Sequence, residues 1–231
     1  MSKILIVVPV KECSTRLPRK NLKPLCGKPL FTWALDATIK AADALGADLR
    51  VVTESVEIAQ FAIIKGAGVY IYPNEKLACD PYQTSDACRY ALNQLGTENY
   101  ETLIMVQPSN PFVTLMDIVE CFGMWNVNRD NAIRMAMEDR RQHWEVWTGQ
   151  KIIVPYCRTR LAIGVGSVVV VGIDRFLKNQ FIGPTIPYYV PKERAIDIDD
   201  DMDFTMAEYV MKNKLYMKNE ENGSTDEGGD F

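Results

Sequence analysis

Residues 4–30 decide the fold class: residues 4–10 read ILIVVPV and residues 11–30 continue KECSTRLPRKNLKPLCGKPL. The first stretch is an apolar run of strand length, which predicts a buried strand. The second, called the basic loop below, holds six lysines and arginines, although the formal net charge of the whole chain is −4. Open α/β sheets bind anions beyond the carboxyl ends of their strands. We therefore expect a phosphorylated ligand here, most simply a nucleoside triphosphate; a solvated charged loop is the alternative.

Strands and helices alternate along the first half of the chain. Further apolar runs of strand length lie at residues 49–53, 69–72 and 103–106. Helical periodicity predicts helices at residues 30–44, 57–65, 85–95 and 114–125. Gly66 and Gly68 are plausible C-terminal caps of the second helix, and Thr114 is the expected N-cap of the fourth. This alternation predicts an α/β fold with a mostly parallel sheet and right-handed crossovers.

The regular alternation ends near residue 130. Strands are expected at residues 131–137, 151–155 and 167–171, and a last helix at residues 201–214. Residues 138–160 are polar and aromatic and could be an insertion that projects from the sheet. Residues 219–231 are rich in Gly, Ser and acids, which predicts a disordered tail. Since no repeat or linker divides the chain, residues 1–218 are expected to form a single domain.

Composition excludes several classes of protein. The acidic net charge argues against a general nucleic-acid binder, because binding to the phosphate backbone normally needs a basic face. No apolar stretch has the length of a membrane span, and residues 4–10 are too short for a signal peptide. The six cysteines contain no Cys-x-x-Cys pair, which speaks against a zinc site or a disulfide framework. We expect reduced thiols in a cytoplasmic protein.

Two further polar segments could join the basic loop in one site. Gln107-Pro108-Ser109-Asn110-Pro111 follows the strand expected at residues 103–106, so it should lie at the same sheet edge, where its polar side chains could contact a polyhydroxylated ligand. Turn chemistry explains this segment about as well.

The other segment is acidic. Asp197 and Asp199 alternate in an extended stretch and so share one face, where two carboxylates opposite a triphosphate could hold Mg²⁺. Asp200, Asp201 and Asp203 are better explained as capping and first-turn acids of the next helix. The alternative is that all five are helix-start acids.

At these places the chain resembles the cytidylyltransferases that activate acidic sugars, namely CMP-acylneuraminate synthetases and their legionaminate, pseudaminate and Kdo relatives. The likeness lies in four ordered motifs: residues 17–30, Leu77-Ala78-Cys79-Asp80, residues 107–111, and residues 196–199 with Asp203, Ala207 and Glu208. The first motif follows the neuraminate signature, whereas residues 14–18 are closer to the Kdo type.

The resemblance implies a Rossmann-like fold of the nucleotide-diphospho-sugar transferase type. It also implies a Mg²⁺-dependent reaction of CTP with a 2-keto sugar acid, and a homodimer joined through an extension at residues 138–165. Lys20, helped by Arg16 and Lys11, would neutralise the triphosphate, and Asp197 and Asp199 would hold the metal. The residues implied in nucleotide binding are Ser14, Arg19, Asn21, Cys79, Asp80, Gln107 and Pro108.

The chain departs from the family pattern on the sugar side. Neuraminate enzymes carry Arg-Pro-Asn-Gly before the late strand, where residues 163–166 here read Ile-Gly-Val-Gly. Gln107 and Ser109 are the expected sugar contacts, and Arg158 or Arg160 could replace the missing arginine.

Three departures lie elsewhere: Glu12 places an acid beside the triphosphate site, Cys79 stands where the family has serine, and Val113 stands where it has arginine.

Two alternative functions remain open. One is a nucleotidyltransferase with a different acceptor or base, and the other is an inactive nucleotide-binding protein.

Overall fold

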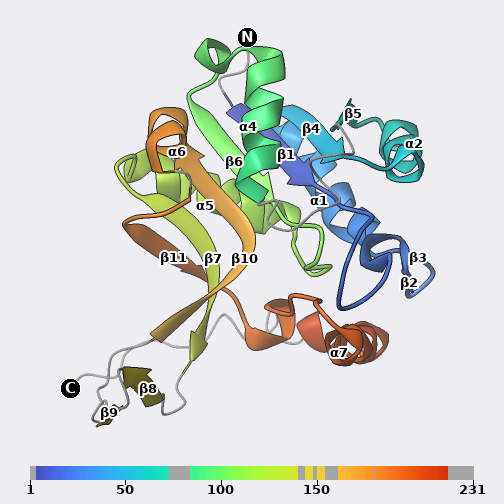
Figure 1. Ribbon diagram of the computed structural model, residues 1–231, viewed down its shortest axis with the longest axis vertical. Coiled ribbons are helices and arrows are strands. Elements are labelled where there is room, and N and C mark those ends of the chain that lie inside the picture. The colour runs from blue at the N-terminus through green and yellow to red at the C-terminus, as the bar shows by residue number, and fades with distance from the viewer. Residues whose placement is uncertain are drawn as a thin grey trace.

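The computed structural model describes residues 4–72, 84–139, 144–147, 150–153, 161–179 and 181–217. Its centre is a seven-stranded sheet in the order β11-β7-β10-β6-β1-β4-β5. Helices cover both faces of this sheet, and α7 (Asp201–Lys212) lies beside one end of it (Figure 1). The expected α/β architecture with helices on both sides of a sheet is confirmed.

One half of the sheet is parallel. It contains β1 (Ile4–Pro9), β4 (Asp48–Thr53), β5 (Gly68–Ile71) and β6 (Thr102–Val106). The connecting helices are α1 (Phe31–Leu45), α2 (Val56–Ile64) and α4 (Thr84–Leu95). Strand β1 lies between β4 and β6 and is buried on both faces, which explains why its sequence is a continuous apolar run and not an alternating one.

The other half contains a reversal of direction. After α5 (Leu115–Val127), strand β7 (Ala132–Asp139) runs parallel to β11 (Thr185–Tyr189), and β10 (Leu161–Gly172) lies antiparallel between β7 and β6. Helix α6 (Ile173–Asn179) follows β10. Strands β8 (Trp144–Trp147) and β9 (Gln150–Ile153) pair with each other beyond the ends of β7 and β10, away from the helices (Figure 1).

Three groups of buried apolar residues stabilise this arrangement. The first lies between the sheet and α1, α2 and α5, and the second between the sheet and α4 and α6. The third joins Leu17, Leu25 and Leu30 of the basic loop to Ile198 and to Phe204 of α7. Because this third group packs the basic loop against the segment that carries Asp197 and Asp199, it sets two halves of the expected site side by side.

The basic loop is itself folded. It contains a 3-10 helix, η1 (Lys20–Leu22), and a small hairpin of β2 (Pro24–Leu25) and β3 (Lys28–Pro29). The two residues between these strands, Cys26 and Gly27, have φ values of 47° and 93°. Positive φ at both central positions is the signature of a type I′ turn, which matches the twist of paired strands.

Most of the expected elements are present, with five differences. Helix α6 and strands β8 and β11 were not predicted, and Gly68 is the first residue of β5 and not a helix cap. Gly66, with φ 87°, follows Lys65, the C-cap of α2, and so has the expected place. Strand β10 begins six residues earlier than the strand expected at 167–171. Among the described residues, none of the helices is long and apolar enough to cross a membrane.

Candidate active site

A cavity of about 370 Å³ opens at the carboxyl ends of β1, β4 and β6. This volume is within the range of small-molecule sites. It lies where the polar segments were expected to meet, and the described residues that line it include Lys11, Cys13, Ser14, Lys20, Asn21, Glu54, Thr84, Gln107, Pro108, Ser109, Asp197 and Asp199. The basic loop, the turn after β6 and the acidic segment therefore share one site.

Lys20 and Asp199 form the charged centre of the cavity. The Lys20 side chain is only 13% exposed, its Nζ lies 3.1 Å from Asp199 Oδ1, and it also donates to the carbonyl oxygen of Ile198. Arg16 Nη2 lies 2.8 Å from the other carboxylate oxygen of Asp199. Burial alone would raise the pKa of Asp199, but the hydrogen bonds and charges of Lys20 and Arg16 outweigh it and hold the pKa below its usual range.

Asp197 has the opposite electrostatic environment. Burial raises its pKa, a hydrogen bond from Ser109 lowers it, and the nearby Asp199 carboxylate raises it again. Its Oδ1 atom is buried and has no hydrogen-bond partner. The Ile198 backbone N–H, between the two acids, donates to Ser109 O over 2.9 Å. The backbone between the two carboxylates is thus fixed against the turn that follows β6.

The acidic pair suits a divalent cation. The described residues contain no cluster of three or more histidine, cysteine or acidic side chains that could hold a metal alone. Mg²⁺ is commonly held by one or two carboxylates together with substrate phosphates. Asp197 Oδ1 is a buried acceptor that lacks a donor, and both acids line the cavity, so the donor set fits a cation that arrives with a phosphorylated ligand.

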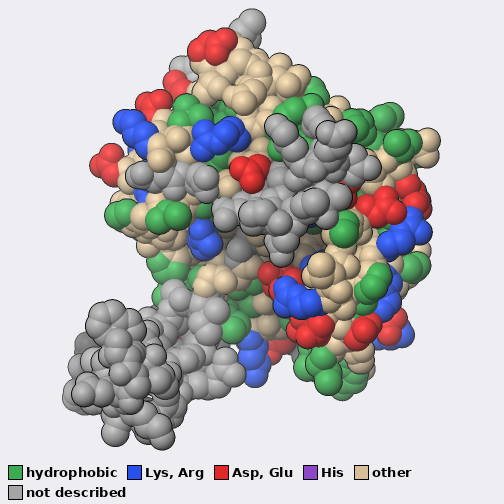
Figure 2. Space-filling view, viewed as in Figure 1, with side chains coloured by type: hydrophobic (Ala, Val, Ile, Leu, Met, Phe, Trp, Pro, Cys, Tyr) green, Lys and Arg blue, Asp and Glu red, His purple; other side chains and the backbone are tan. Residues whose placement is uncertain are grey.

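The cations of the basic loop are paired more completely than the sequence suggested. They cannot all pair within the loop, because the loop contains a single acid, Glu12. Acids from other elements supply partners: Asp199 for Arg16 and Lys20, Asp201 for Lys23, Asp36 for Lys28, and Glu57 for Arg19. Figure 2 shows charges of both signs mixed on the side where Figure 1 places β2, β3 and α7.

The Glu12 carboxylate is bonded to side chains outside the cavity and does not face the expected phosphate site. Its carboxylate accepts from Arg19 Nε over 3.0 Å and from the Ser55 hydroxyl, and Arg19 also pairs with Glu57. Arg19 is not among the described residues that line the cavity, and neither is Arg16, whose guanidinium reaches Asp199 from outside. Glu12 therefore fixes Arg19 on α2 and does not place an unpaired acid in the cavity.

Glu54, at the end of β4, was missed by reasoning from the sequence. Its Oε1 accepts the backbone N–H groups of Glu12 over 2.8 Å and Cys13 over 3.3 Å, and it lines the cavity. Asn21 completes this support, because its side chain is buried and donates to Lys11 O over 2.6 Å. These two side chains hold the start of the basic loop; the position of Glu54 directly after a strand was the available signal.

The turn after β6 divides its polar side chains between two tasks. Gln107, Pro108 and Ser109 line the cavity, and the Gln107 N–H donates to Ser167 O of β10 over 2.8 Å. Asn110, expected to contact a ligand, is instead completely buried and bonded within the protein. Cys79, Asp80, Arg158 and Arg160 lie outside the described residues.

The acids of residues 200–203 have the expected structural role. Asp200 is the N-cap of α7 and forms a capping box with Asp203. Asp203 also accepts the Asp199 N–H over 3.0 Å. The metal-binding expectation is thus confined to Asp197 and Asp199, and the helix start accounts for Asp200, Asp201 and Asp203.

Comparison with known proteins identifies the family of this chain. The sequence matches the family described as cytidylyltransferase over residues 5–221. The CMP-N,N'-diacetyllegionaminic acid synthase of Legionella pneumophila is 24% identical over 229 residues, which cover 91% of this chain and 97% of that protein. The N-acylneuraminate cytidylyltransferase of Escherichia coli is also 24% identical, over 94% of this chain and 54% of that protein.

Two solved structures share the fold. A CMP:2-keto-3-deoxy-manno-octonic acid synthetase complexed with CTP has a TM-score of 0.67 at 17% identity and covers 93% of this chain and 100% of that one. A 4-diphosphocytidyl-2C-methyl-D-erythritol synthase from Anaerococcus prevotii has a TM-score of 0.64 at 10% identity, over 90% and 98% of the two chains. The fold is thus that of nucleotide-diphospho-sugar transferases, and since the family match spans nearly the whole sequence, the chain belongs to the cytidylyltransferase family.

Proposed function

We propose that this protein transfers the cytidylyl group of CTP to a 2-keto sugar acid of the nonulosonic or Kdo type, releasing pyrophosphate. The observation that carries the proposal is the meeting of Lys20, Asp197 and Asp199 with Gln107 in one cavity, in a chain that matches the cytidylyltransferase family over residues 5–221. Curated relatives named for CMP-legionaminate and CMP-neuraminate synthesis support this choice of acceptor class.

The cavity offers what such a reaction needs. The anomeric hydroxyl of the sugar attacks the α-phosphorus of CTP and loses its proton to solvent, a new P–O bond forms, and the bond to the departing pyrophosphate breaks. Lys20 would place a fixed cation beside the phosphates, and Lys11 and Ser14 line the same wall. Asn21, Gln107 and Pro108 would contact the nucleotide, and Gln107 and Ser109 the sugar. Holding both reactants in line is the main contribution of the protein in such chemistry.

Asp197 and Asp199 are the proposed ligands of Mg²⁺. The cation would neutralise charge on the phosphate oxygens. The buried, unpartnered Oδ1 of Asp197 supports this role, since a bound cation would supply the favourable contact that the oxygen lacks. Asp199 would exchange part of its pairing with Lys20 and Arg16 for the metal.

We also propose a homodimer and a cytoplasmic location. The β8–β9 hairpin lies beyond the sheet, as an extension that reaches toward a second subunit would. The free thiols of Cys13, Cys26, Cys88 and Cys121 support a reducing compartment such as the cytoplasm.

Pyrophosphate release tests the proposed reaction. The protein is incubated with Mg²⁺ and each of the four ribonucleoside triphosphates, against a panel of 2-keto sugar acids and neutral sugar phosphates. Release with CTP and an acid is expected. Release only with another nucleotide or a neutral acceptor would assign a different transferase activity, and CTP binding without release from any pair would indicate a nucleotide-binding protein without catalysis.

A further inference from the structure

The segment that carries Asp197 and Asp199 has little regular structure of its own. Between β11 and α7 its only helical turn in the described residues is the 3-10 helix η3 (Lys192–Arg194). Two carboxylates that share a ligand must nevertheless be held within a fraction of an ångström of their working positions. Contacts to other elements must therefore hold this segment in place.

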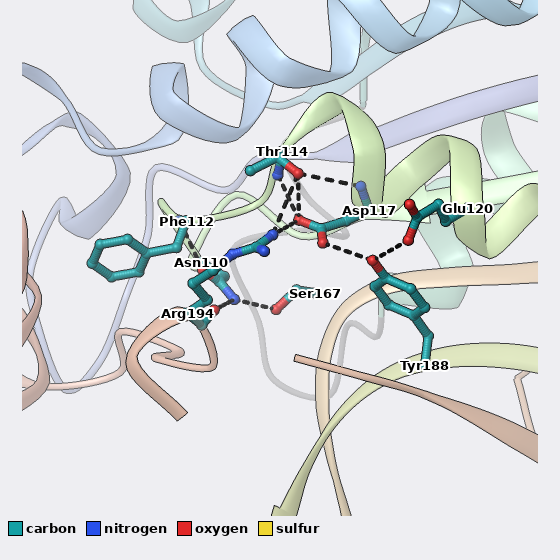
Figure 3. Close-up of polar contacts among 8 residues, drawn as sticks. All are labelled: Asn110, Phe112, Thr114, Asp117, Glu120, Ser167, Tyr188 and Arg194. Atoms are coloured by element: carbon teal, nitrogen blue, oxygen red, sulfur yellow. Dashed lines mark hydrogen bonds and ion pairs between the residues drawn. The ribbon is translucent and has the colours of Figure 1, made fainter. Parts of the chain in front are cut away.

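Asn110 supplies one set of contacts. It is completely buried; its Nδ2 donates to Ser167 Oγ over 2.8 Å and to Arg194 O over 2.9 Å, and its Oδ1 accepts from Phe112 N over 2.9 Å. One side chain thereby joins the turn after β6, strand β10 and the end of η3. Figure 3 shows Asn110 between Ser167 and Arg194.

The Arg194 side chain supplies a second set. Its guanidinium pairs with Asp117 and lies 3.3 Å from Thr114 Oγ1, and the two charged side chains are 12% and 1% exposed. Asp117 is also the capping-box acid of α5 and accepts the Thr114 N–H over 2.8 Å. Tyr188 Oη, from β11, lies 2.7 Å from Glu120 Oε2 and 3.3 Å from Asp117 Oδ1 (Figure 3).

A buried ion pair of this kind contributes little net stability, because desolvation of the two charges offsets their attraction. Its geometric effect is larger. Arg194 lies three residues before Asp197, and the Ile198 N–H is bonded to Ser109 O in the same turn that contains Asn110. The turn and the acidic segment are therefore joined at two points, one at residue 194 and one at residue 198.

We propose that Asn110, Thr114, Asp117 and Arg194, called the Arg194 cluster, are positioning residues for the Asp197 and Asp199 carboxylates. The cluster fixes where the two acids stand relative to Ser109 and so sets the affinity of the site for its divalent cation. This inference rests on the proposed function for the cation at Asp197 and Asp199 and for the CTP that arrives with it. Groups that orient metal ligands typically change metal affinity or activity by about 10–100-fold when they are mutated.

The test is a double variant, D117N/R194Q, which removes both buried charges together, so that no charge is left unpaired. Binding of Mn²⁺ in the presence of CTP is followed by electron paramagnetic resonance, and binding of CTP in EDTA by calorimetry. The expected result is a rise of about tenfold or more in the Mn²⁺ dissociation constant with CTP affinity in EDTA unchanged. R194K, which keeps the charge and loses the planar fork, should show an intermediate rise.

The matched control is F176L, a truncation in the core between the sheet and α6, on the other face of the sheet. It should lower the melting temperature and leave Mn²⁺ binding at the wild-type value. Wild-type Mn²⁺ affinity in D117N/R194Q overturns the proposal, as does an equal loss of affinity in F176L. A wild-type protein that binds Mn²⁺ and CTP but transfers to no sugar acid would overturn the proposed reaction and leave the cluster's role measurable.

Discussion

Neighbouring residues of the acidic segment have opposite charge environments. Asp199 is stabilised as an anion by Lys20 and Arg16, whereas Asp197 is held in a buried place that disfavours its charge. Functional sites frequently contain one carboxylate whose ionised form is destabilised beside another whose ionised form is stabilised. The destabilised carboxylate gains the most favourable interaction energy when a ligand binds. The two acids thus differ in what they contribute before a ligand binds.

Lys20→Ala tests the main cation of the cavity. Loss of its charge should lower turnover by about 10²-fold or more, as is typical when a preorganised electrostatic partner of the transition state is removed. The Ile198 carbonyl and Asp199 lose a donor, so a stability loss of about 1 kcal/mol is also expected. Turnover is measured by pyrophosphate release and stability by thermal unfolding. Lys23→Ala, whose partner Asp201 is exposed, is the control; equal turnover in the two variants would contradict the assignment.

Asp197→Asn should stabilise the ligand-free protein while it impairs catalysis. Burial raises the pKa of Asp197 above the usual 3.8, so the folded state binds its proton more tightly than the unfolded chain does. The ionised group therefore destabilises the fold at neutral pH, and this penalty fades as pH falls through the folded pKa toward 3.8. Asparagine removes the penalty, which should add roughly 0.5–2 kcal/mol near pH 7.

Thermal unfolding of wild type and Asp197→Asn between pH 4 and 8 measures this effect. The difference in melting temperature should be largest near neutrality and shrink toward the acid end. A variant that is less stable than wild type at pH 7 would show that the carboxylate is well satisfied in the fold.

Part of the site was predictable from the sequence because strand ends reveal which loops share a sheet edge. That argument correctly brought together Lys20 and Gln107, and the sharing of one face by Asp197 and Asp199 correctly indicated that these two acids belong to the same site. It could not predict the partners of the loop cations, since Asp36, Glu57 and Asp201 come from three different helices. It also misjudged Asn110, because an amide in a turn looks the same in sequence whether it faces a ligand or the core.

Among the elements, those with strong periodicity were the predictable ones. The expected helices at 30–44 and 57–65 agree with α1 and α2 to within one residue at each end. Strand β11 was missed because Pro187 lies at its centre, which is tolerated only because β11 is an edge strand. Helix α6 was missed because its seven residues are too few to show a clear helical periodicity, and because it directly follows a β-branched run that predicts a strand.

The β2–β3 hairpin offers a prediction at this scale. Cys26 adopts φ 47°, a conformation that favours asparagine or glycine over cysteine at this turn position. Cys26→Asn should raise stability by roughly 0.5–1 kcal/mol, because left-handed backbone is costly for other residues. Chemical denaturation provides the measurement, with Cys13→Asn as a control at a residue outside the positive-φ set. No gain in Cys26→Asn alone would show that the turn does not limit stability.

For the whole molecule, the antiparallel strand β10 separates the sheet into a side that carries the cavity and an outer side. Strands β1, β4 and β6 end at the cavity, whereas β7 and β10 lead to the β8–β9 hairpin. The same sheet thus carries both the candidate site and the β8–β9 hairpin. The reversal at β10 was not predictable, because strand direction depends on long-range pairing that no local pattern records.

Replacing residues 140–160 with a short Gly-Ser linker tests the proposed dimer. The wild type should sediment as a dimer and the variant as a monomer, while CTP binding is expected to be kept because the described residues that line the cavity lie outside the replaced segment. Analytical ultracentrifugation and calorimetry provide the two measurements. A monomeric wild type, or a variant that remains dimeric, would contradict the role given to this extension.

The pairing of Asp199 with Lys20 and Arg16 has a consequence for how the protein responds to salt. In the free protein this carboxylate serves as the counter-ion of Lys20 and Arg16. A triphosphate that binds there would replace the carboxylate as their partner, and few ions would be released into solution. Salt dependence of anion binding arises from released solution ions. In metal-free buffer, the affinity for CTP should therefore fall only gently as salt rises, and Asp199→Asn, which frees both cations to recruit anions from solution, should give a steeper decline.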